Sequence, residues 1–196
     1  MGLAETRAFF DRMAPQWDTF CEVRPQVLAA MTAVLQPEPG AHILDIACGT
    51  GVLEPNLLLC SPAEIRAIDL SPAMVSLAQR KCMDPRVQFS CTDLFDFQEG
   101  GFDCAVLYNA YPHFPDKAAL FAHIAGRLRP GGRFLLMHGD GRDVINGCHD
   151  GEAKEHANLL LPAREEAARM APWFSVDALC DTPRLYFISG TVRTDE

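Results

Sequence analysis

The sequence has few basic residues and no long apolar run. Its 17 lysines and arginines stand against 26 aspartates and glutamates, so the 196-residue chain has a formal net charge of −9. An acidic surface repels nucleic acid and anionic membranes, which argues against both as general partners. No run approaches the ~18 apolar residues of a membrane span. The opening residues also lack the basic start and apolar stretch of a secretory signal, so we expect a cytoplasmic protein.

Paired cysteines are also missing. The chain contains eight cysteines, but none of them forms a CxxC pair. Several lie within apolar runs such as FDCAVLY, where a free thiol behaves as a small hydrophobic side chain. The cysteines therefore predict a reduced protein rather than a disulfide framework.

What is present is a regular alternation of short apolar runs and helical patterns. Strand-like runs cover 42–47, 64–70, 86–91, 102–108 and 133–139, and helical patterns cover 53–60, 71–81 and 115–128. Strands separated by helices predict parallel βαβ units in a doubly wound α/β sheet. The final runs, 173–180 and 184–192, are joined by too few residues for a parallel crossover and predict an antiparallel hairpin. We expect one domain over 1–196, with a mostly parallel seven-stranded sheet that ends in this hairpin.

Two segments lie outside that alternation. Residues 1–36 have helical patterns and an apolar cluster near their start, made of Phe9, Phe10, Met13 and Trp17. Residues 140–172 contain a polar, histidine-bearing stretch, followed by a helical pattern that begins near Pro162. We expect the first segment to form a lid and the second to be an insertion on the substrate side.

The first strand ends in a glycine turn, DIACGTG. Glycines at 49 and 51 allow a tight turn and let a ligand approach main-chain N–H groups. A dinucleotide-binding turn needs a third glycine, but Glu54 occupies that position. A buried helix–strand contact and a pyrophosphate would both disfavour a glutamate, so NAD and FAD are disfavoured. The P-loop pattern also fails, because no Gly-Lys-Ser/Thr follows.

Acidic residues lie at three successive strand ends of the predicted sheet. Asp45 is in the first turn, Asp69 ends the second strand, and Asp93 follows the third. Each alone is explained by a turn or helix cap. Together they indicate a binding site, because open α/β sheets bind ligands at the carboxyl ends of their strands. A carboxylate at the end of the second strand typically accepts hydrogen bonds from ribose hydroxyls.

These motifs resemble those of the class I S-adenosylmethionine-dependent methyltransferases, in order and over nearly the whole length. The matching segments are LDIACGTG, AIDLSPAMVSLAQRK, CTDLFDF and the stretch from FDCAVLYNAYPHF to RPGGRFLL. The opening FFDRMAPQWD is similar to the lead-in of the ubiquinone/menaquinone C-methyltransferases, a small-molecule branch. The resemblance implies a Rossmann-like methyltransferase fold, S-adenosylmethionine as cofactor and a small-molecule acceptor.

The resemblance also implies the cofactor contacts. They are Trp17, Asp45, Ala47, Gly49, Gly51, Asp69, Leu70, Asp93, Leu94, Asn109 and Ala110. Asp45 would organise the amino group of the methionine part, which lies against the glycines and beside Asn109 and Ala110. Asp69 would hold the ribose, Asp93 the adenine amine, and Trp17 would belong to the lid. Ala47 stands where the family usually has glycine.

Catalytic candidates follow the fourth and fifth strands, where an acceptor must meet the methyl group. They are Tyr111, His113, His138 and His149. His113 is a candidate general base because an unperturbed histidine titrates near neutral pH; the alternative is a loop histidine that packs against Phe114. If 142–149 is helical, Arg142, Asn146 and His149 share one face, which would contact a polar substrate or be a solvated surface. No tight ligand pattern indicates a metal site.

Three alternatives stay open. The first is a non-catalytic S-adenosylmethionine-binding sensor or partner subunit. The second is a nucleotide-dependent oxidoreductase, which Glu54 disfavours. The third is a metalloid methyltransferase with a thiol triad, for which Cys21, Cys148 and Cys180 are the candidates without any characteristic pairing. The sequence also lacks the [DN]PP[YF] signature of base amino-group methylation, since its counterpart here is NAYP.

Overall fold

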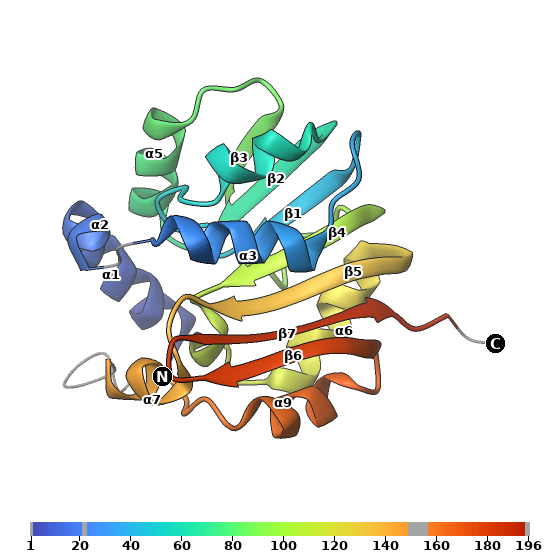
Figure 1. The fold of residues 1–196 in the computed structure, drawn as a ribbon. Coiled ribbons are helices and arrows are strands. Elements are labelled where there is room, and N and C mark those ends of the chain that lie inside the picture. The colour runs from blue at the N-terminus through green and yellow to red at the C-terminus, as the bar shows by residue number, and fades with distance from the viewer. Residues whose placement is uncertain (1, 21–22, 149–156, 195–196) are drawn as a thin grey trace.

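A seven-stranded sheet in the order β3-β2-β1-β4-β5-β7-β6 forms the centre of the molecule (Figure 1). The computed structural model describes residues 2–20, 23–148 and 157–194. The strands are β1 (His42–Ile46), β2 (Glu64–Asp69), β3 (Val87–Cys91), β4 (Phe102–Tyr108), β5 (Leu128–His138), β6 (Phe174–Thr182) and β7 (Leu185–Val192). All neighbours from β3 to β5 pair in parallel, whereas β7 pairs antiparallel with both β5 and β6. The predicted sheet with its terminal hairpin is confirmed.

Helices connect the strands and cover the sheet. They are α1 (Leu3–Met13), α2 (Trp17–Phe20), α3 (Pro25–Leu35), α4 (Glu54–Leu57), α5 (Pro72–Lys81), α6 (Lys117–Arg127), α7 (Arg142–Gly147) and α9 (Ala163–Met170). Short 3-10 turns are η1 (Ala14–Gln16), η2 (Leu58–Cys60) and η3 (Tyr111–His113). No helix among the described residues is both long and apolar enough to cross a membrane.

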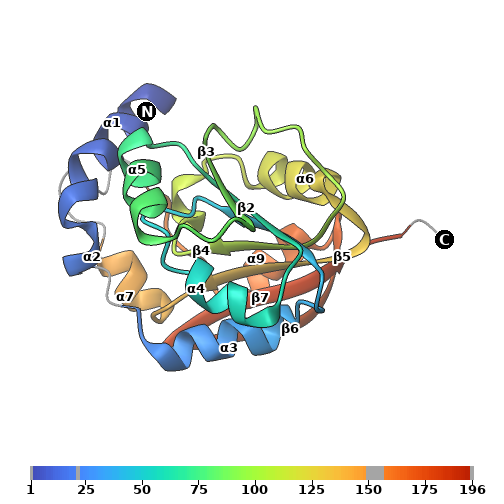
Figure 2. The same ribbon diagram turned by 90° about the horizontal axis from the view of Figure 1, so that it is seen from above.

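Both faces of the sheet are buried, which explains the nearly continuous apolar run of β4. Cys104 and Val106 point to one face and Ala105 and Leu107 to the other, as the two-residue period of a strand requires. The first face packs against α3 and α4, and the second against α6 and α9. Figure 2 shows α3 and α6 on opposite sides of the sheet. A parallel sheet covered on both faces is the arrangement that leaves its strand ends free for a ligand.

Local capping fixes where two of the connecting helices begin. The Ser71 hydroxyl accepts a hydrogen bond from the backbone N–H of Met74 at 3.1 Å, and Pro72 occupies the first helical position of α5. The carboxylate of Asp116 accepts from the N–H of Ala119 at 2.9 Å at the start of α6. These caps satisfy N–H groups that have no partner within the helix.

Two segments differ from the sequence-based expectation. The strand predicted over 133–139 begins earlier, at Leu128. The residues RPGG therefore lie within β5, as an irregularity between its pairs with Phe102 and Cys104. The N-terminal segment 1–36 also divides into two parts. Val27, Met31 and Leu35 of α3 are buried in the core, whereas α1 and α2 lie at the end of the sheet toward which β4 and β5 run (Figure 1).

Candidate functional site

A cavity of about 290 Å³ lies at the carboxyl ends of β1, β2 and β4. Most of the residues expected to contact a ligand border it: Trp17, Asp45, Ala47, Gly49, Asp69, Leu70, Asp93, Leu94, Asn109, Ala110 and His113. Gly51, Tyr111 and His138 do not border it, and His149 lies outside the described residues. The fold therefore brings the three strand-end acids together in one place.

The glycine turn after β1 depends on left-handed backbone conformations. Ala47 and Gly49 both have φ of 56°, and Gly51 has φ of 78°. A Cβ on Gly51 would lie 3.0 Å from the Cβ of Ala78 and 3.3 Å from an Oε of Glu54. Gly51 therefore serves the packing of the turn against α5 rather than the lining of the cavity. Only at Gly49 does the turn present a side-chain-free residue to the cavity itself.

Asp69 fixes the glycine turn to the end of β2. One carboxylate oxygen accepts the N–H of Gly49 at 2.9 Å and the other accepts the N–H of Ser71 at 2.8 Å. Burial raises the pKa of Asp69, and these two hydrogen bonds oppose that rise. Each oxygen keeps a further acceptor position, so the carboxylate is available to a ligand in the cavity. The sequence did not indicate its bond to Gly49, which lies twenty residues earlier.

Asp45 and Glu54 form a buried carboxyl pair below this turn. They are 1 % and 0 % exposed, and no described group donates a well-formed hydrogen bond to any of their four oxygens. Burial raises the pKa of Glu54 to about 7. Burial also raises the pKa of Asp45, and the charge of Glu54 raises it further. The expectation that a buried contact would disfavour Glu54 is wrong, because Glu54 is fully buried here next to Asp45.

Asp93 and Asn109 border the cavity and also form hydrogen bonds with nearby backbone groups. Asp93 accepts the N–H of Phe95 at 2.7 Å, the turn role that any acid at this position offers. Asn109 has a left-handed φ of 55°, and its side-chain oxygen accepts the N–H of Gly139 at 2.8 Å. This bond ties the loop after β4 to the end of β5. Leu94 and Ala110 border the cavity as buried apolar residues.

An aromatic cluster from α1, α2 and η3 closes one side of the cavity. The ring of Phe10 packs edge-on against Trp17 at 5.7 Å and against His113 at 5.0 Å between ring centroids. Phe9 packs against Phe10 at 5.3 Å but is buried away from the cavity. Both interpretations of His113 meet here, since it borders the cavity and also packs on an aromatic ring. The predicted partner Phe114 borders the cavity beside it.

Two carboxylates fasten these N-terminal helices to the core. Asp18 accepts a hydrogen bond from the Thr50 hydroxyl in the glycine turn at 2.5 Å and forms an ion pair with Lys81. Burial raises the pKa of Asp18, but the hydrogen bonds from Lys81 and Thr50 outweigh it and lower the pKa overall. Asp11 accepts a hydrogen bond from the Ser71 hydroxyl at 2.5 Å. Both acids lie in the FFDRMAPQWD lead-in, but that motif did not indicate their partners, which are distant in sequence.

Two predicted catalytic residues are engaged elsewhere. Tyr111 is 1 % exposed, and its hydroxyl donates to the buried carboxylate of Glu166 at 2.5 Å. Burial and this hydrogen bond raise the pKa of Tyr111. His138 is 1 % exposed and packs edge-on against Tyr186 at 6.0 Å. Neither side chain borders the cavity, so a direct part in catalysis there is not compatible with this geometry.

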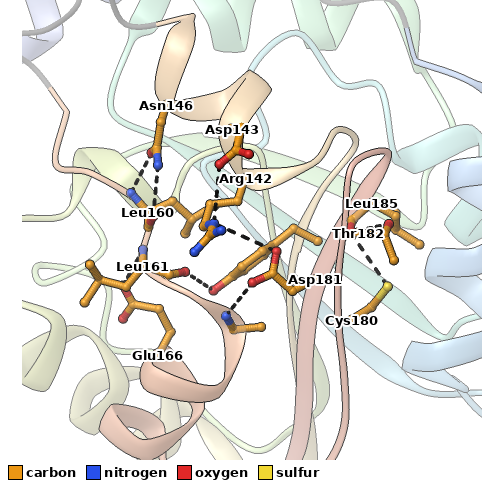
Figure 3. Close-up of polar contacts among 12 residues, drawn as sticks. Arg142, Asp143, Asn146, Leu160, Leu161, Glu166, Cys180, Asp181, Thr182 and Leu185 are labelled. Atoms are coloured by element: carbon orange, nitrogen blue, oxygen red, sulfur yellow. Dashed lines mark hydrogen bonds and ion pairs between the residues drawn. The ribbon is translucent and has the colours of Figure 1, made fainter.

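In the described part of 142–149, the side chains of the predicted polar face contact other segments of the protein (Figure 3). The amide of Asn146 both donates to the carbonyl of Leu160 at 3.0 Å and accepts from its N–H at 2.7 Å. Arg142 lies 3.9 Å from a carboxylate oxygen of Asp181 on β6. Neither side chain borders the cavity. These contacts fasten α7 to the segment before α9, rather than presenting a face to a substrate.

Among the described residues, the cysteines proposed for a thiol triad do not lie at the cavity. Cys148 is exposed at the end of α7, and the thiol of Cys180 on β6 lies 3.7 Å from the carbonyl of Leu185. Neither borders the cavity, and Cys21 lies outside the described residues.

Comparisons with known proteins agree with this arrangement. Residues 43–132 match a methyltransferase domain family. The ubiquinone biosynthesis O-methyltransferase of Xanthomonas axonopodis pv. citri (strain 306) is 34 % identical over 119 residues, which cover 58 % of this chain and 49 % of that protein. The chain thus spans about half the length of the curated relatives it matches.

Solved structures extend the similarity to the whole fold. One similar chain comes from the complex between the Haloferax volcanii Trm112 methyltransferase activator and a methyltransferase. Its TM-score is 0.77 at 18 % identity, and the match covers 94 % of this chain and 98 % of that chain. The N-methyltransferase NodS from Bradyrhizobium japonicum WM9, in complex with S-adenosyl-L-homocysteine, has a TM-score of 0.74 at 13 % identity, covering 96 % and 99 %. The matched domain, the curated relatives and the fold all agree with the resemblance to the class I S-adenosylmethionine-dependent methyltransferases.

Proposed function

We propose that this chain transfers the methyl group of S-adenosylmethionine to a small, neutral acceptor. The observation that carries the proposal is that Asp45, Asp69 and Asp93, which lie at the carboxyl ends of three different parallel strands, border one cavity. The cavity lies at the low end of the roughly 300–1,000 Å³ of small-molecule sites. A site of this size under an aromatic cover suits a small molecule.

The charge of the cavity fits this cofactor. Among the described residues, no lysine or arginine borders the cavity, whereas three aspartates do. S-Adenosylmethionine carries a sulfonium and an ammonium, which carboxylates attract, while the pyrophosphate of NAD would meet negative charge without a counter-charge. The Asp45 oxygens also have no donor from the described protein, which an ammonium would supply. The residues present therefore suit a cationic cofactor.

Residues at each strand end would contact a different part of S-adenosylmethionine. Asp69, which already orders the glycine turn, would accept from the ribose hydroxyls. Asp93 and Leu94 would hold the adenine, and Asp45 with Gly49, Asn109 and Ala110 the methionine part. Trp17 would cover the site from α2.

S-Adenosylmethionine supplies a methyl group already activated on sulfur, so the protein has to position the acceptor, exclude water and, for a protonated nucleophile, remove a proton. His113 is the candidate base because it borders the cavity. Phe10 packs on its ring and would hold it in orientation. Tyr111 and His138 take no part, and a role for His149 stays a prediction.

The lining also bears on the acceptor. Phe10, Trp17 and Phe114 present apolar surface. The described cavity wall has no basic residue that could pair with a carboxylate or phosphate of an acceptor. A neutral molecule with apolar surface is the acceptor class that suits this wall. The net charge of −9 argues further against nucleic acid.

The proposal is tested by incubating the purified chain with S-adenosylmethionine and a panel of neutral acceptors that carry hydroxyl, amine, thiol or carbon nucleophiles. We expect release of S-adenosylhomocysteine that depends on one acceptor class. Tight cofactor binding without turnover on any acceptor would instead favour the sensor or partner subunit.

Substituting Asp69 tests the placement of the cofactor. Asp69→Ala removes a charge-assisted acceptor, so cofactor binding should weaken by about 1.5–3 kcal/mol in a calorimetric titration. Asp103→Ala is the matched control, because Asp103 also accepts a backbone N–H, that of His42 at 2.7 Å, but lies outside the cavity wall. Equal affinity of the wild type and the Asp69 variant would remove the ribose assignment.

A further inference from the structure

Glu54 is a buried carboxyl group that the proposed cofactor contacts leave without a role. It does not border the cavity, but it contacts Asp45, which does. Two facing carboxylates present only acceptors. The backbone N–H groups of Leu53 and Glu54 lower the pKa of Glu54, but no described group meets hydrogen-bond geometry at any of the four oxygens. One proton held between the two groups would supply the missing donor.

The surroundings favour such a shared proton. Asp69 faces the pair from β2 with a like charge, and the Cys48 thiol faces it from the turn. The positive charge of Lys81 on α5 lowers the pKa of Glu54, but Lys81 also forms the ion pair with Asp18. Two full negative charges at a site this buried are costly, and two carboxyl groups that share one site keep a proton.

We propose that Glu54 is a positioning residue of the cofactor site, which shares one proton with Asp45 and holds the Asp45 carboxylate at the cavity floor as a single negative charge. This inference rests on the proposed placement of the cofactor's methionine part beside Asp45. One negative charge matches one ammonium group. A doubly protonated pair would leave that ammonium without a counter-charge.

The shared proton has a consequence for binding. An ammonium next to Asp45 stabilises the ionised form of the pair, so the shared proton is held less tightly in the complex than in the free protein. Binding near neutral pH should therefore release part of a proton to the buffer. The group that releases it is Glu54, together with Asp45.

Two variants of Glu54 separate positioning from packing. Glu54→Gln keeps an N–H donor for Asp45 and removes the titrating proton, whereas Glu54→Leu removes the donor as well. Calorimetric titration of S-adenosylhomocysteine should give Glu54→Gln an affinity within about threefold of the wild type. Loss of a hydrogen bond to a charged group predicts a decrease of about tenfold or more for Glu54→Leu. Equal losses in both variants, or none in either, would overturn the positioning role.

Proton release is measured by repeating the titration at pH 7 in buffers of different ionisation enthalpy. We expect a net release from the wild type and a clearly smaller one from Glu54→Gln. Glu99→Gln is the control, since Glu99 is an exposed glutamate paired with Arg66, and it should match the wild type. Equal proton release from the wild type and Glu54→Gln would overturn the shared proton.

The cofactor-free protein gives an independent readout. A pKa of about 7 in the folded chain against 4.5 in an unfolded glutamate means that the folded state binds more protons between these values. The stabilisation is fully present below pH 4.5 and is lost as the pH rises through 7. Relative to Glu54→Gln, the wild type should lose stability toward urea over this range, and a constant difference would overturn the shared proton.

The outcomes also separate this inference from the proposed function. If the wild type does not bind S-adenosylhomocysteine, the proposed function is overturned and the positioning role with it, while the urea measurement still decides on the shared proton. If it binds without linked proton release, the function stands and the role of Glu54 is overturned.

Discussion

Two residues on the cavity wall have backbone conformations that favour glycine, although neither is glycine. Asn109 tolerates its φ of 55° because short polar side chains visit the left-handed region. Ala47 has no such compensation at φ of 56°, and its Cβ costs about 1–2 kcal/mol there. The structure thus gives the reason why glycine is usual at this point of the turn. It also shows that alanine is small enough to keep the turn.

Replacing Ala47 tests this strain. Ala47→Gly should stabilise the chain by about 0.5–1 kcal/mol in urea unfolding, because relief of the left-handed strain exceeds the added entropy of an unfolded glycine. Cofactor affinity should stay within about twofold. Ala119→Gly, within α6, is the control and should instead destabilise by about 1 kcal/mol. A destabilised Ala47 variant would contradict the strain argument.

The proposed base gives a second test at this scale. His113→Gln should leave S-adenosylhomocysteine affinity nearly unchanged and lower turnover roughly 100-fold or more with an acceptor that loses a proton. His123→Gln is the control, because His123 contacts the carbonyl of Phe97 outside the cavity wall. Unchanged turnover in the His113 variant would assign the residue to packing against Phe10.

At the scale of elements, two carboxylates hold α1 and α2 to the core, in addition to the packing of Phe10 on His113. Asp18 and Asp11 reach the glycine turn and the start of α5, the two backbone segments nearest the predicted cofactor. Opening of α1 and α2 would therefore release the turn as well as the cavity. We therefore predict that closure of the expected lid and order in the glycine turn are coupled through the Thr50–Asp18 hydrogen bond.

Removal of one contact should loosen the lid. Asp18→Ala loses both Thr50 and Lys81, so we expect faster release of S-adenosylhomocysteine, about 3–10-fold weaker binding and faster amide exchange over 3–20. Because the pKa of Asp18 is lowered, its stabilisation is fully present above the pKa of a free aspartate. It is lost as the pH falls below that value and through the lowered pKa of the folded chain. Asp84→Ala, which breaks the ion pair with Arg86, should change none of these. Unaltered exchange over 3–20 would show that the lid does not depend on Asp18.

For the whole molecule, the alternation of strands and helices predicted the sheet, its hairpin and the edge where the strand-end acids meet. Periodicity carries that information, because each strand's neighbours follow from parallel crossovers. It carries no information on partners that are distant in sequence. Tyr111 and Glu166 meet across 55 positions, and Asn146 meets Leu160 across an undescribed stretch. Their chemistry suggested function, but their neighbours give them structural roles.

The burial of Glu54 also shows that a sequence pattern does not reveal which side chains become neighbours. Its position in a glycine-turn motif correctly disfavoured a dinucleotide, yet the reason that a buried contact would exclude a carboxylate was wrong. Whether a buried acid is tolerated depends on whether a second group shares its proton, and Asp45 does so from a strand nine residues earlier. A sequence pattern specifies the residue types, whereas packing decides which of them face the ligand.

A structure of the chain with S-adenosylhomocysteine bound tests the central claim most directly. The account predicts one molecule in the cavity, with its ammonium at Asp45, its ribose hydroxyls at Asp69 and its adenine at Asp93. The sulfur should face the space beside His113 and Phe10. A molecule bound elsewhere, or bound in the cavity with its ribose away from Asp69, would contradict the account.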